Sequence, residues 1–284
     1  MNVDLEKSIK AKLRAIAKEK NCDPADLWQT LMLERFLARL GQSIYRNHFI
    51  LKGGVLLSKY IEIGRETRDL DFLARKINHE IENLEVIFKT IAALDLEDGF
   101  SFKELQISQL VHPHMRYTGA EVAMMAYFGK VRSKVNIDIG FGDVVRPIQK
   151  IIPFIHHSKG ALFESETLLF CYPKESIFAE KLETIVHRGA LNSRMKDFHD
   201  LHSLISAPEP FAFTNLKNVI QAVFKRRQTP LTIPILFEDE ALVSLQRLWN
   251  NYLKGLRIQE AEKLPLTVAQ VLQRLNEWLQ AHHP

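Results

Sequence analysis

The apolar positions at the start of the chain predict two amphipathic helices. The first covers residues 4–20, and its apolar face consists of Leu5, Ile9, Leu13 and Ile16. The second is predicted to begin at Asp23 and Pro24, because an acceptor side chain at the N-cap and proline at the first helical position start helices well. It extends to about Leu40, and Gly41 is the predicted C-cap.

Residues 49–74 combine strand and helix patterns in a short space and read FILKGGVLLSKYIEIGRETRDLDFLA. The pattern predicts a short apolar strand, a glycine turn and a short amphipathic helix. A polar loop and a second apolar strand follow, and the second strand opens with Asp-Leu-Asp. Residues 78–94 are predicted to form a further amphipathic helix.

Between residues 101 and 141 the pattern changes to alternating and β-rich segments, FKELQISQLV, AEVAMMAYFG and SKVNIDIGFG. Pro113, Gly119 and Gly129 separate them. These segments are expected to continue the sheet of the first two strands. A loop with Pro147 and Pro153 follows, and one more strand is predicted near 167–172.

Pro173 marks the best domain boundary, because it separates β-rich sequence from a helical remainder. The sequence predicts an α+β protein with two domains. Residues 1–172 form a mixed sheet flanked by helices, and residues 173–284 form an α-helical domain. The helices expected in the second domain cover residues 174–190, 194–206, 214–227, 239–254 and 267–282.

Composition adds limits on class and location. Hydrophobic residues make up 46% and charged residues 25% of the 284, as in ordinary soluble globular proteins. The chain has no apolar run of about 18 residues, and its charged start lacks a secretory signal, so no membrane association is expected. Cys22 and Cys171 follow no metal-ligand spacing, which favours a reducing cytoplasm.

The charge balance is mildly basic, with a net charge of +4 and a pI near 8.9. This permits an acidic partner such as RNA without requiring one. Lys225, Arg226 and Arg227 form the densest basic run. The run suits a solvated helix end or, alternatively, a phosphate contact.

The glycine turn and the Asp-Leu-Asp strand together suggest nucleotidyl-transfer chemistry. Gly53 and Gly54 can bring backbone N–H groups close to phosphates, because no Cβ blocks the approach. Asp69 and Asp71 project from the same face of a strand. Two carboxylates on one face suit Mg²⁺, which commonly binds through one or two carboxylates plus substrate phosphates.

Asp138 and Lys52 are further candidates with open alternatives. Asp138 lies in the middle of an apolar strand, where an unpaired carboxylate is costly to bury. Three carboxylates sharing two metals would remove that cost, whereas pairing with Arg132 or Lys134 at the sheet surface is the alternative. Lys52 either points into the site or caps the strand.

A third cluster lies in residues 175–200, ESIFAEKLETIVHRGALNSRMKDFHD. Lys181 and Arg188 are seven residues apart and share a helix face. Arg194, Asp197 and Asp200 recur at three-residue steps on the next helix. Basic and acidic groups on adjoining helices can grip a triphosphate and orient a nucleophile.

The alternative for this cluster is ion pairing within the second helix. Lys196 would then pair with Asp200, and Arg194 with Asp197. Exposed pairs of this kind contribute only about 0.3–0.5 kcal/mol. The sequence alone leaves both interpretations open.

Four motifs in order, LKGG, TRDLDF, NIDIGFGD and AEKLETIVHRGALNSRMKDFHDL, carry a family resemblance. The chain resembles the AbiEii/AbiGii-type nucleotidyltransferase toxins of the polymerase-β nucleotidyltransferase superfamily. The resemblance extends from the N-terminal helices to about residue 205. It implies a mixed sheet flanked by helices and then a helical C-terminal domain.

The resemblance also implies roles for particular residues. Asp69 and Asp71 would hold Mg²⁺ and the nucleoside triphosphate, Lys181 would contact phosphates, and Asp197 would be a candidate general base. Together with the candidates argued from the residues themselves, the expected site residues are Asp69, Asp71, Lys181 and Asp197 for catalysis, Lys52, Gly53, Gly54, Arg68, Lys181 and Arg194 for the nucleotide, and Asp69, Asp71 and Asp138 for the metal.

The family includes enzymes that transfer a nucleotide from an NTP onto the 3′ end of tRNA. Its members commonly pair with a cognate antitoxin and act as stress or phage-defence toxins. One departure concerns the turn, since Val55 follows Gly53-Gly54 where many relatives have a hydroxyl residue. Backbone N–H groups must then supply the contact to the triphosphate.

The resulting interpretation is a cytoplasmic Mg²⁺-dependent nucleotidyltransferase, the toxin of a toxin–antitoxin pair. Its acceptor is expected to be the 3′ end of tRNA. The alternatives are a protein hydroxyl as acceptor and a nucleotide-binding module without turnover. Asp69, Asp71 and Asp138 are all intact, which argues against the last of these.

Overall fold

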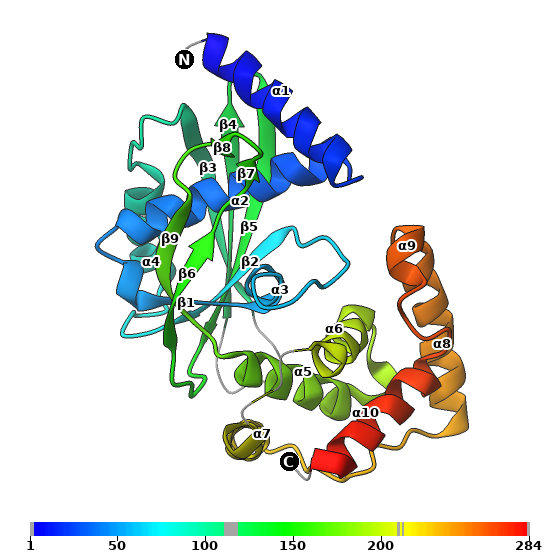
Figure 1. The fold of residues 1–284 in the computed structure, drawn as a ribbon. Helices are drawn as coiled ribbons and strands as arrows, with labels where there is room; N and C mark the ends of the chain where they lie inside the picture. The colour runs from blue at the N-terminus through cyan, green and yellow to red at the C-terminus, as the bar shows by residue number, and fades with distance from the viewer. Residues whose placement is uncertain (1–2, 111–118, 209–210, 212, 283–284) are drawn as a thin grey trace. The chain divides into compact units, whose positions relative to one another are not determined.

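A computed structural model describes residues 3–110, 119–208, 211 and 213–282 of the chain (Figure 1). The chain divides into two compact units that each combine distant segments. Unit 1 consists of Met1–Lys59, Glu66–Asp143 and Pro147–Cys171, and unit 2 of Tyr60–Arg65, Val144–Arg146 and Tyr172–Pro284. The short segment 60–65 therefore belongs to unit 2, although the chain on both sides of it belongs to unit 1.

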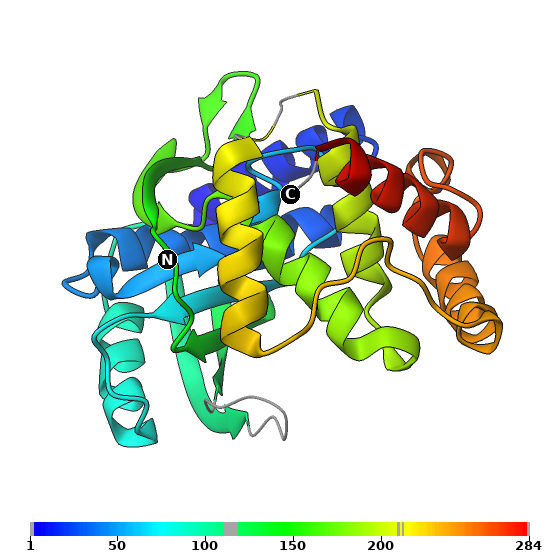
Figure 2. The ribbon, with the colours of Figure 1, turned by 90° about the horizontal axis from the view of Figure 1, so that it is seen from below.

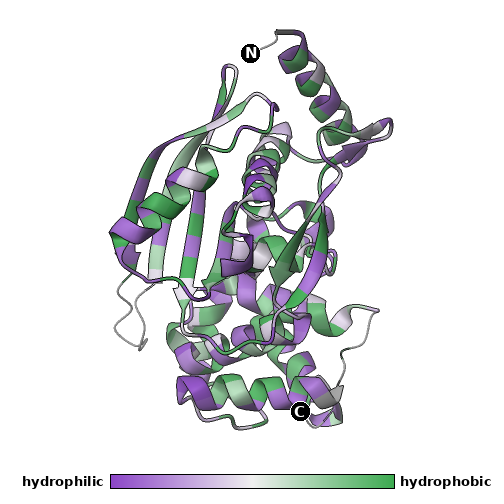
Figure 3. Ribbon diagram, turned by 90° about the vertical axis from the view of Figure 1, so that its left-hand side faces the viewer, coloured by the Kyte–Doolittle hydropathy of each residue, from purple (hydrophilic) through white to green (hydrophobic). Residues whose placement is uncertain are grey.

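Unit 1 is built on a seven-stranded mixed sheet with the order β3-β4-β5-β2-β1-β9-β6. β2 runs parallel to β5 and β1 parallel to β9, and the remaining neighbours are antiparallel. The strands are β1 (Phe49–Lys52), β2 (Asp69–Ala74), β3 (Phe100–Leu110), β4 (Gly119–Phe128), β5 (Val131–Phe141), β6 (Ile148–Pro153) and β9 (Glu166–Cys171), with a separate small hairpin of β7 (His156–His157) and β8 (Gly160–Ala161). Figure 3 shows hydrophobic and hydrophilic residues alternating along the strands, so the two faces of the sheet differ.

The helices of unit 1 are α1 (Val3–Glu19), α2 (Pro24–Gln42), α3 (Gly53–Leu57) and α4 (Ile81–Ala92), with a 3₁₀ turn at Arg46–His48. α2 packs on β5 and β9 and also against α4. Apolar side chains fill this interface, and Phe49 contacts both Phe72 of β2 and Phe88 of α4 edge to face. The opposite face of β2 and β5 is the one that carries the aspartates.

A buried ion network also anchors α2 in unit 1. Arg39 donates to both carboxylate oxygens of Asp98, at 2.8 and 2.9 Å, and Arg35 donates to Asp98 at 2.7 Å. All three side chains are almost fully buried. These ion pairs compensate the buried charges, although Arg35 Nη2 and Arg39 Nε have no hydrogen-bond partner among the described residues.

Unit 2 is helical. Its helices are α5 (Lys174–Arg188), α6 (Met195–Ser206), α7 (Phe213–Arg227), α8 (Asp239–Lys254), α9 (Ile258–Ala261) and α10 (Val268–His282), with a 3₁₀ turn at Gly189–Leu191. Figure 2 shows α7 running beside α5, which agrees with their extensive contact. The Tyr60 hydroxyl donates to the Tyr172 carbonyl oxygen at 2.7 Å, which ties segment 60–65 to this unit.

The predicted α+β class and the mixed sheet flanked by helices are confirmed. Asp23 caps α2 as predicted, since its side chain accepts from the Ala25 amide at 2.8 Å, and Gly189 ends α5. The predicted cap at Gly41 is wrong, because α2 continues to Gln42. Gly41 is instead needed for packing, since a Cβ there would lie 2.0 Å from the Thr167 hydroxyl oxygen.

The stretch read as a loop between Pro147 and Pro153 is another difference, because it contains β6. β6 lies at an edge of the sheet and ends at Pro153, and an edge strand tolerates proline. The short helix α9 was also not predicted. Pro113, which was expected to separate two strands, lies outside the described residues.

Candidate active site

Four charged residues lie in one row across four neighbouring strands of unit 1. Lys52 of β1 is opposite Asp71 of β2, which is opposite Asp138 of β5, and Asp138 is opposite Glu121 of β4. Residues that are directly opposite share a face of the sheet. The register therefore places three carboxylates and one lysine on a single face.

Asp69 lies beside this row, on the same face of the sheet. It lies two residues before Asp71 and so projects from the same face, opposite Asn136 of β5. The Asn136 side-chain amide donates to the Asp69 carboxylate at 3.3 Å. Asp69 and Asp138 are exposed and Asp71 is half-buried, so water or a ligand can reach the carboxylates.

The glycine turn lies directly against Asp71. Gly53 has a positive φ of 69°, which favours glycine, and a Cβ at this position would lie only 1.9 Å from an Asp71 carboxylate oxygen. The turn therefore requires glycine for two independent reasons. Gly54 follows in the first turn of α3. The backbone of the Gly53 turn and the Asp71 carboxylate are therefore close neighbours in unit 1.

The ammonium group of Lys52 points over the polar face of the sheet. Its Nζ lies 3.2 Å from the Asp143 carboxylate and 3.7 Å from the position a Cβ would take at Gly140. Arg68 behaves differently, since its guanidinium is largely exposed and pairs with Asp26 at 3.1 Å. Of these two candidate nucleotide contacts, Lys52 is the one that lies in the row of carboxylates.

The donor chemistry of this face fits a hard divalent cation. Asp69, Asp71 and Asp138 present only carboxylate oxygens, which Mg²⁺ prefers. Among the described residues, no group of three or more His, Cys, Asp or Glu side chains is gathered closely enough to form a complete metal cage. Mg²⁺ commonly binds through one or two carboxylates, and substrate phosphates and water complete its shell.

A second charged cluster lies in unit 2, where Lys181 of α5 inserts between two aspartates of α6. Its Nζ lies 2.7 Å from Asp197 Oδ1 and 2.7 Å from Asp200 Oδ2. The carboxylates of Asp197 and Asp200 are almost completely buried and Lys181 nearly so. The pairing is therefore required, because an unpaired charge at such a place is strongly unfavourable.

Two arginines complete this cluster. Arg65, from segment 60–65, holds both oxygens of Asp200 at 2.7 Å in a bidentate pair. Arg194 donates from Nε to Asp197 Oδ2 at 2.8 Å, and its side chain is 45% exposed. Three cations thus share two carboxylates, and the one on the accessible side is Arg194. We call these five residues the charged network of unit 2.

The network shifts the pKa values of Lys181 and Asp200. Burial alone would lower the pKa of Lys181, but the Asp200 and Asp197 carboxylates outweigh burial and raise it. Burial alone would raise the pKa of Asp200, but Lys181 and Arg65 outweigh it and lower the pKa to about 2. Both groups are therefore charged at neutral pH.

Two neighbours of the network remain neutral. Burial lowers the pKa of His199 to about 4, and its Nδ1 lies 2.7 Å from the Tyr252 hydroxyl. Burial also raises the pKa of Tyr252. The imidazole and the phenol therefore act as neutral hydrogen-bonding groups beside the charged ones.

The ion pairs of this cluster differ in part from those expected from the sequence. Arg194 does pair with Asp197, but the ion partners of Asp200 are Lys181 and Arg65 instead of Lys196. Arg65 was not predicted. The available signal was an arginine four residues before Asp69 in a polar loop, but sequence alone gives no partner for it.

A strand, a Gly-Gly turn, a short helix and an Asp-Leu-Asp strand on a mixed sheet define the chain as a nucleotidyltransferase. The chain belongs to the AbiEii family, whose description is a nucleotidyl transferase AbiEii toxin of a type IV toxin–antitoxin system, and the match covers residues 35–280. The predicted family and enzyme class are confirmed. Membership implies a nucleotide substrate and an antitoxin partner.

Solved structures support the fold. JHP933 from Helicobacter pylori matches with a TM-score of 0.54 and 15% identity over 92% of this chain and 93% of its own. MenT4, a nucleotidyltransferase toxin from Mycobacterium tuberculosis H37Rv, matches with a TM-score of 0.50 and 16% identity over 88% of this chain and 94% of its own. At these identities the likeness concerns the fold. No curated protein sequence matches the chain.

In the part of the chain that the structure describes, no helix has both the length and the apolar character needed to cross a bilayer.

Proposed function

We propose that the protein transfers a nucleotide from an NTP to the 3′ hydroxyl of tRNA in a Mg²⁺-dependent reaction. The observation that supports this best is the arrangement in unit 1, where the Asp71 carboxylate lies against the Gly53 turn and Asp69 and Asp138 share its open face. Carboxylates that remain accessible beside a phosphate-binding turn suit a metal–triphosphate complex.

In this proposal Asp69 and Asp71 hold Mg²⁺ and Asp138 contributes from the next strand. The metal, when bound, would neutralise the triphosphate and polarise the α-phosphoryl group. The backbone N–H groups of Gly53 and Gly54 would contact the phosphates. Lys52 would add a positive charge from the same face, and Arg68 would reach the nucleotide from its exposed position by leaving Asp26.

Unit 2 is proposed to supply the acid–base chemistry. The acceptor hydroxyl oxygen attacks the α-phosphorus, the bond to the β-phosphate breaks, and pyrophosphate leaves. The hydroxyl proton goes to Asp197. In the structure Arg194 occupies one oxygen of that carboxylate, and because Arg194 is half-exposed it can turn to a phosphate and leave the oxygen open.

Lys181 would keep Asp197 in place and contact phosphates through its remaining donor. Asp200, itself held by Arg65, would position Lys181 without touching the substrate. The proposed division of labour follows the expected domains, with residues 1–172 for nucleotide and metal and residues 173–284 for the base. Action in the cytoplasm, a cognate antitoxin and a role in phage defence belong to the same proposal.

The direct test is to incubate the purified protein with each NTP labelled at the α-phosphate, together with total tRNA. Label should appear in tRNA with Mg²⁺ and not with excess chelator, and prior periodate oxidation of the RNA 3′ end should prevent it. Label in protein instead of RNA would support a protein hydroxyl as acceptor. Absence of label in either with every NTP would refute the proposal.

A further inference from the structure

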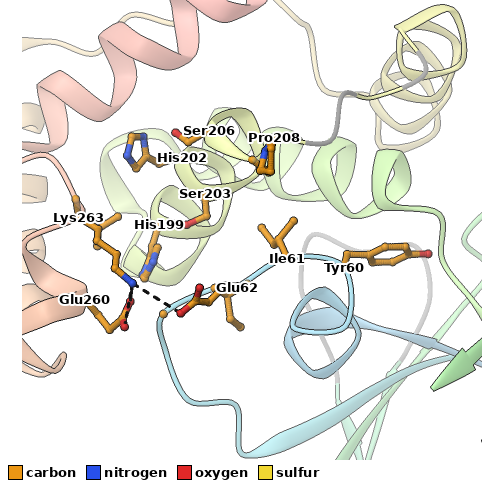
Figure 4. A pocket seen from close by; sticks show the side chains of 14 residues that line it. Tyr60, Ile61, Glu62, His199, His202, Ser203, Ser206, Pro208, Glu260 and Lys263 are labelled. Carbon is orange, nitrogen blue, oxygen red and sulfur yellow. Dashed lines mark hydrogen bonds and ion pairs between the residues drawn. The ribbon is translucent and has the colours of Figure 1, made fainter. Parts of the chain in front are cut away.

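Unit 2 contains a pocket of about 480 Å³ that the proposed chemistry does not use. Segment Tyr60–Gly64, α6 and the chain around α9 enclose it. Figure 4 shows His199, His202, Ser203 and Ser206 projecting from α6 on the side of the pocket. Glu260 and Lys263 face them from the α9 segment.

The pocket lies on a different side of α6 from the charged network. Five residues of an α-helix turn the side chain by about 140°, so His202 points far from Asp197. His199, Ser203 and Ser206 lie on the same side as His202. A ligand in the pocket would therefore lie away from the Asp197 carboxylate.

The charges around the pocket are already matched. Lys263 lies 3.0 and 3.2 Å from the two carboxylate oxygens of Glu260 and 3.7 Å from Glu62. Burial lowers the pKa of both His199 and His202, so both imidazoles are neutral at pH 7. A neutral ligand fits such a lining better than a phosphate or a strong cation.

His202 supplies an unused buried hydrogen-bonding atom. Its Nδ1 is buried and has no hydrogen-bond partner among the described residues. The ring also forms a hydrogen bond with the backbone of Lys263, and this bond raises the pKa of His202. Because a bond that raises the pKa stabilises the protonated ring, the imidazole is its donor. In the neutral ring Nδ1 is then an acceptor, and it can take an N–H from a ligand.

The remaining lining suits a flat heterocycle. Ile61, Ile63, Leu264 and Pro208 give apolar surface. Apolar walls with a few placed polar groups are typical of small-molecule sites. All four nucleobases carry at least one N–H donor, and a base is uncharged at neutral pH.

We propose that this pocket binds an unpaired nucleobase, with His202 Nδ1 accepting a base N–H and the serine hydroxyls completing its polar edge. The inference rests on the proposed function in one respect, since the base would belong to the acceptor RNA. Segment 60–65 forms one wall of the pocket and also carries Arg65, so a bound base would steady the segment that holds Asp200.

Free nucleosides are suitable probes, because they lack phosphate and do not require turnover. Cytidine, adenosine, guanosine and uridine would be titrated into the full-length protein and followed by isothermal titration calorimetry. The titrations are run with and without NTP and Mg²⁺. Binding of at least one nucleoside is expected in both conditions, and Asp69→Asn should leave it unchanged.

Two variants locate the binding. His202→Phe keeps the ring but removes the acceptor, and should weaken the nucleoside at least tenfold. Ser203→Phe fills the pocket and should abolish binding. The matched controls are His282→Phe on α10 and Ser244→Phe, an exposed serine on α8, and both should bind as the wild type does. Circular dichroism checks that each variant is folded.

The outcomes separate this inference from the proposed function. Nucleoside binding that depends on His202 and Ser203, in a protein that labels no RNA, would support the pocket and refute RNA as acceptor. RNA labelling with no nucleoside bound by the wild type, or with binding unchanged in both variants, would overturn the pocket. Binding of putrescine or inorganic phosphate in place of nucleosides would overturn it as well.

Discussion

The aspartates of the two units occupy opposite environments. Asp69 and Asp138 of unit 1 are exposed and Asp71 is only half-buried, whereas Asp197 and Asp200 of unit 2 are buried and held by three cations. Carboxylates that solvent can reach can accept a metal that arrives with the substrate. Carboxylates that are already paired cannot bind a metal without losing those pairs, but their geometry is fixed in advance.

The largest loss of nucleotide transfer is expected from substitutions in unit 1. Asp69→Asn or Asp71→Asn removes a proposed metal ligand and should reduce transfer by roughly a thousandfold, about 4 kcal/mol in the barrier. The melting temperature should stay the same or rise, since repulsion between neighbouring carboxylates is relieved. Asp95→Asn, at another exposed aspartate, is the control. Wild-type turnover of both variants in Mg²⁺ buffer would show that the site is misplaced.

Unit 2 should respond in stability as well as in activity. Lys181→Met removes the central cation, although Arg194 and Arg65 still contact the two carboxylates, so the loss in free energy of unfolding should be about 3 kcal/mol. Lys89→Met removes an exposed i,i+4 pair with Glu85 and should cost well under 1 kcal/mol. Urea unfolding of both variants makes the comparison, and an equal cost would mean that the buried pairing is unimportant.

The pH dependence of stability gives a third test in unit 2. The pKa of His199 is lowered to about 4 in the folded protein, against about 6.5 when unfolded, so the unfolded state binds the proton first. The free energy of unfolding is therefore unaffected by His199 above pH 6.5. It decreases by on the order of 3 kcal/mol as the pH falls through the folded pKa near 4. His199→Gln should flatten the curve of melting temperature between these values, and His282→Gln should not. Parallel curves for both would contradict the burial effect.

The two aspartates of α6 should separate in their effects. Asp197→Asn should reduce transfer about a hundredfold through loss of the base, with a smaller change in stability. Asp200→Asn should act mainly on stability, because it breaks the bidentate pair with Arg65 and the contact with Lys181. Asp98→Asn, in the buried network of unit 1, controls for stability loss without a role in transfer. Equal activity loss at unchanged melting temperature for both α6 variants would disprove the division.

The comparison also shows what the sequence could reveal. The spacing of Gly53, Asp69 and Asp71 was enough to predict that the two aspartates share one face of the sheet behind the glycine turn. A local strand–turn–helix–strand unit sets that geometry. The surroundings of Asp200 were not predictable, since Arg65 lies 135 residues away along the chain. Strand order and register, which place Glu121 beside Asp138, likewise depend on pairing between distant segments.

The same limit applied to smaller features. Gly41 is a residue type typical of helix C-caps, but here glycine is required by the close approach of Thr167, on a strand far along the chain. The pocket around His202 draws on three separate segments, and no local pattern marks it. Periodicity and short motifs therefore predicted elements and local sites, whereas contacts between distant segments required the structure.

The most direct test of the comparison is to measure where a divalent cation binds. Mn²⁺ can replace Mg²⁺ and be counted by electron paramagnetic resonance in the presence of a non-hydrolysable NTP analogue. We predict that Asp69→Asn and Asp71→Asn each weaken Mn²⁺ binding at least tenfold, while Asp197→Asn binds Mn²⁺ as the wild type does. Retention of Mn²⁺ by both unit 1 variants together with its loss in Asp197→Asn would contradict the account.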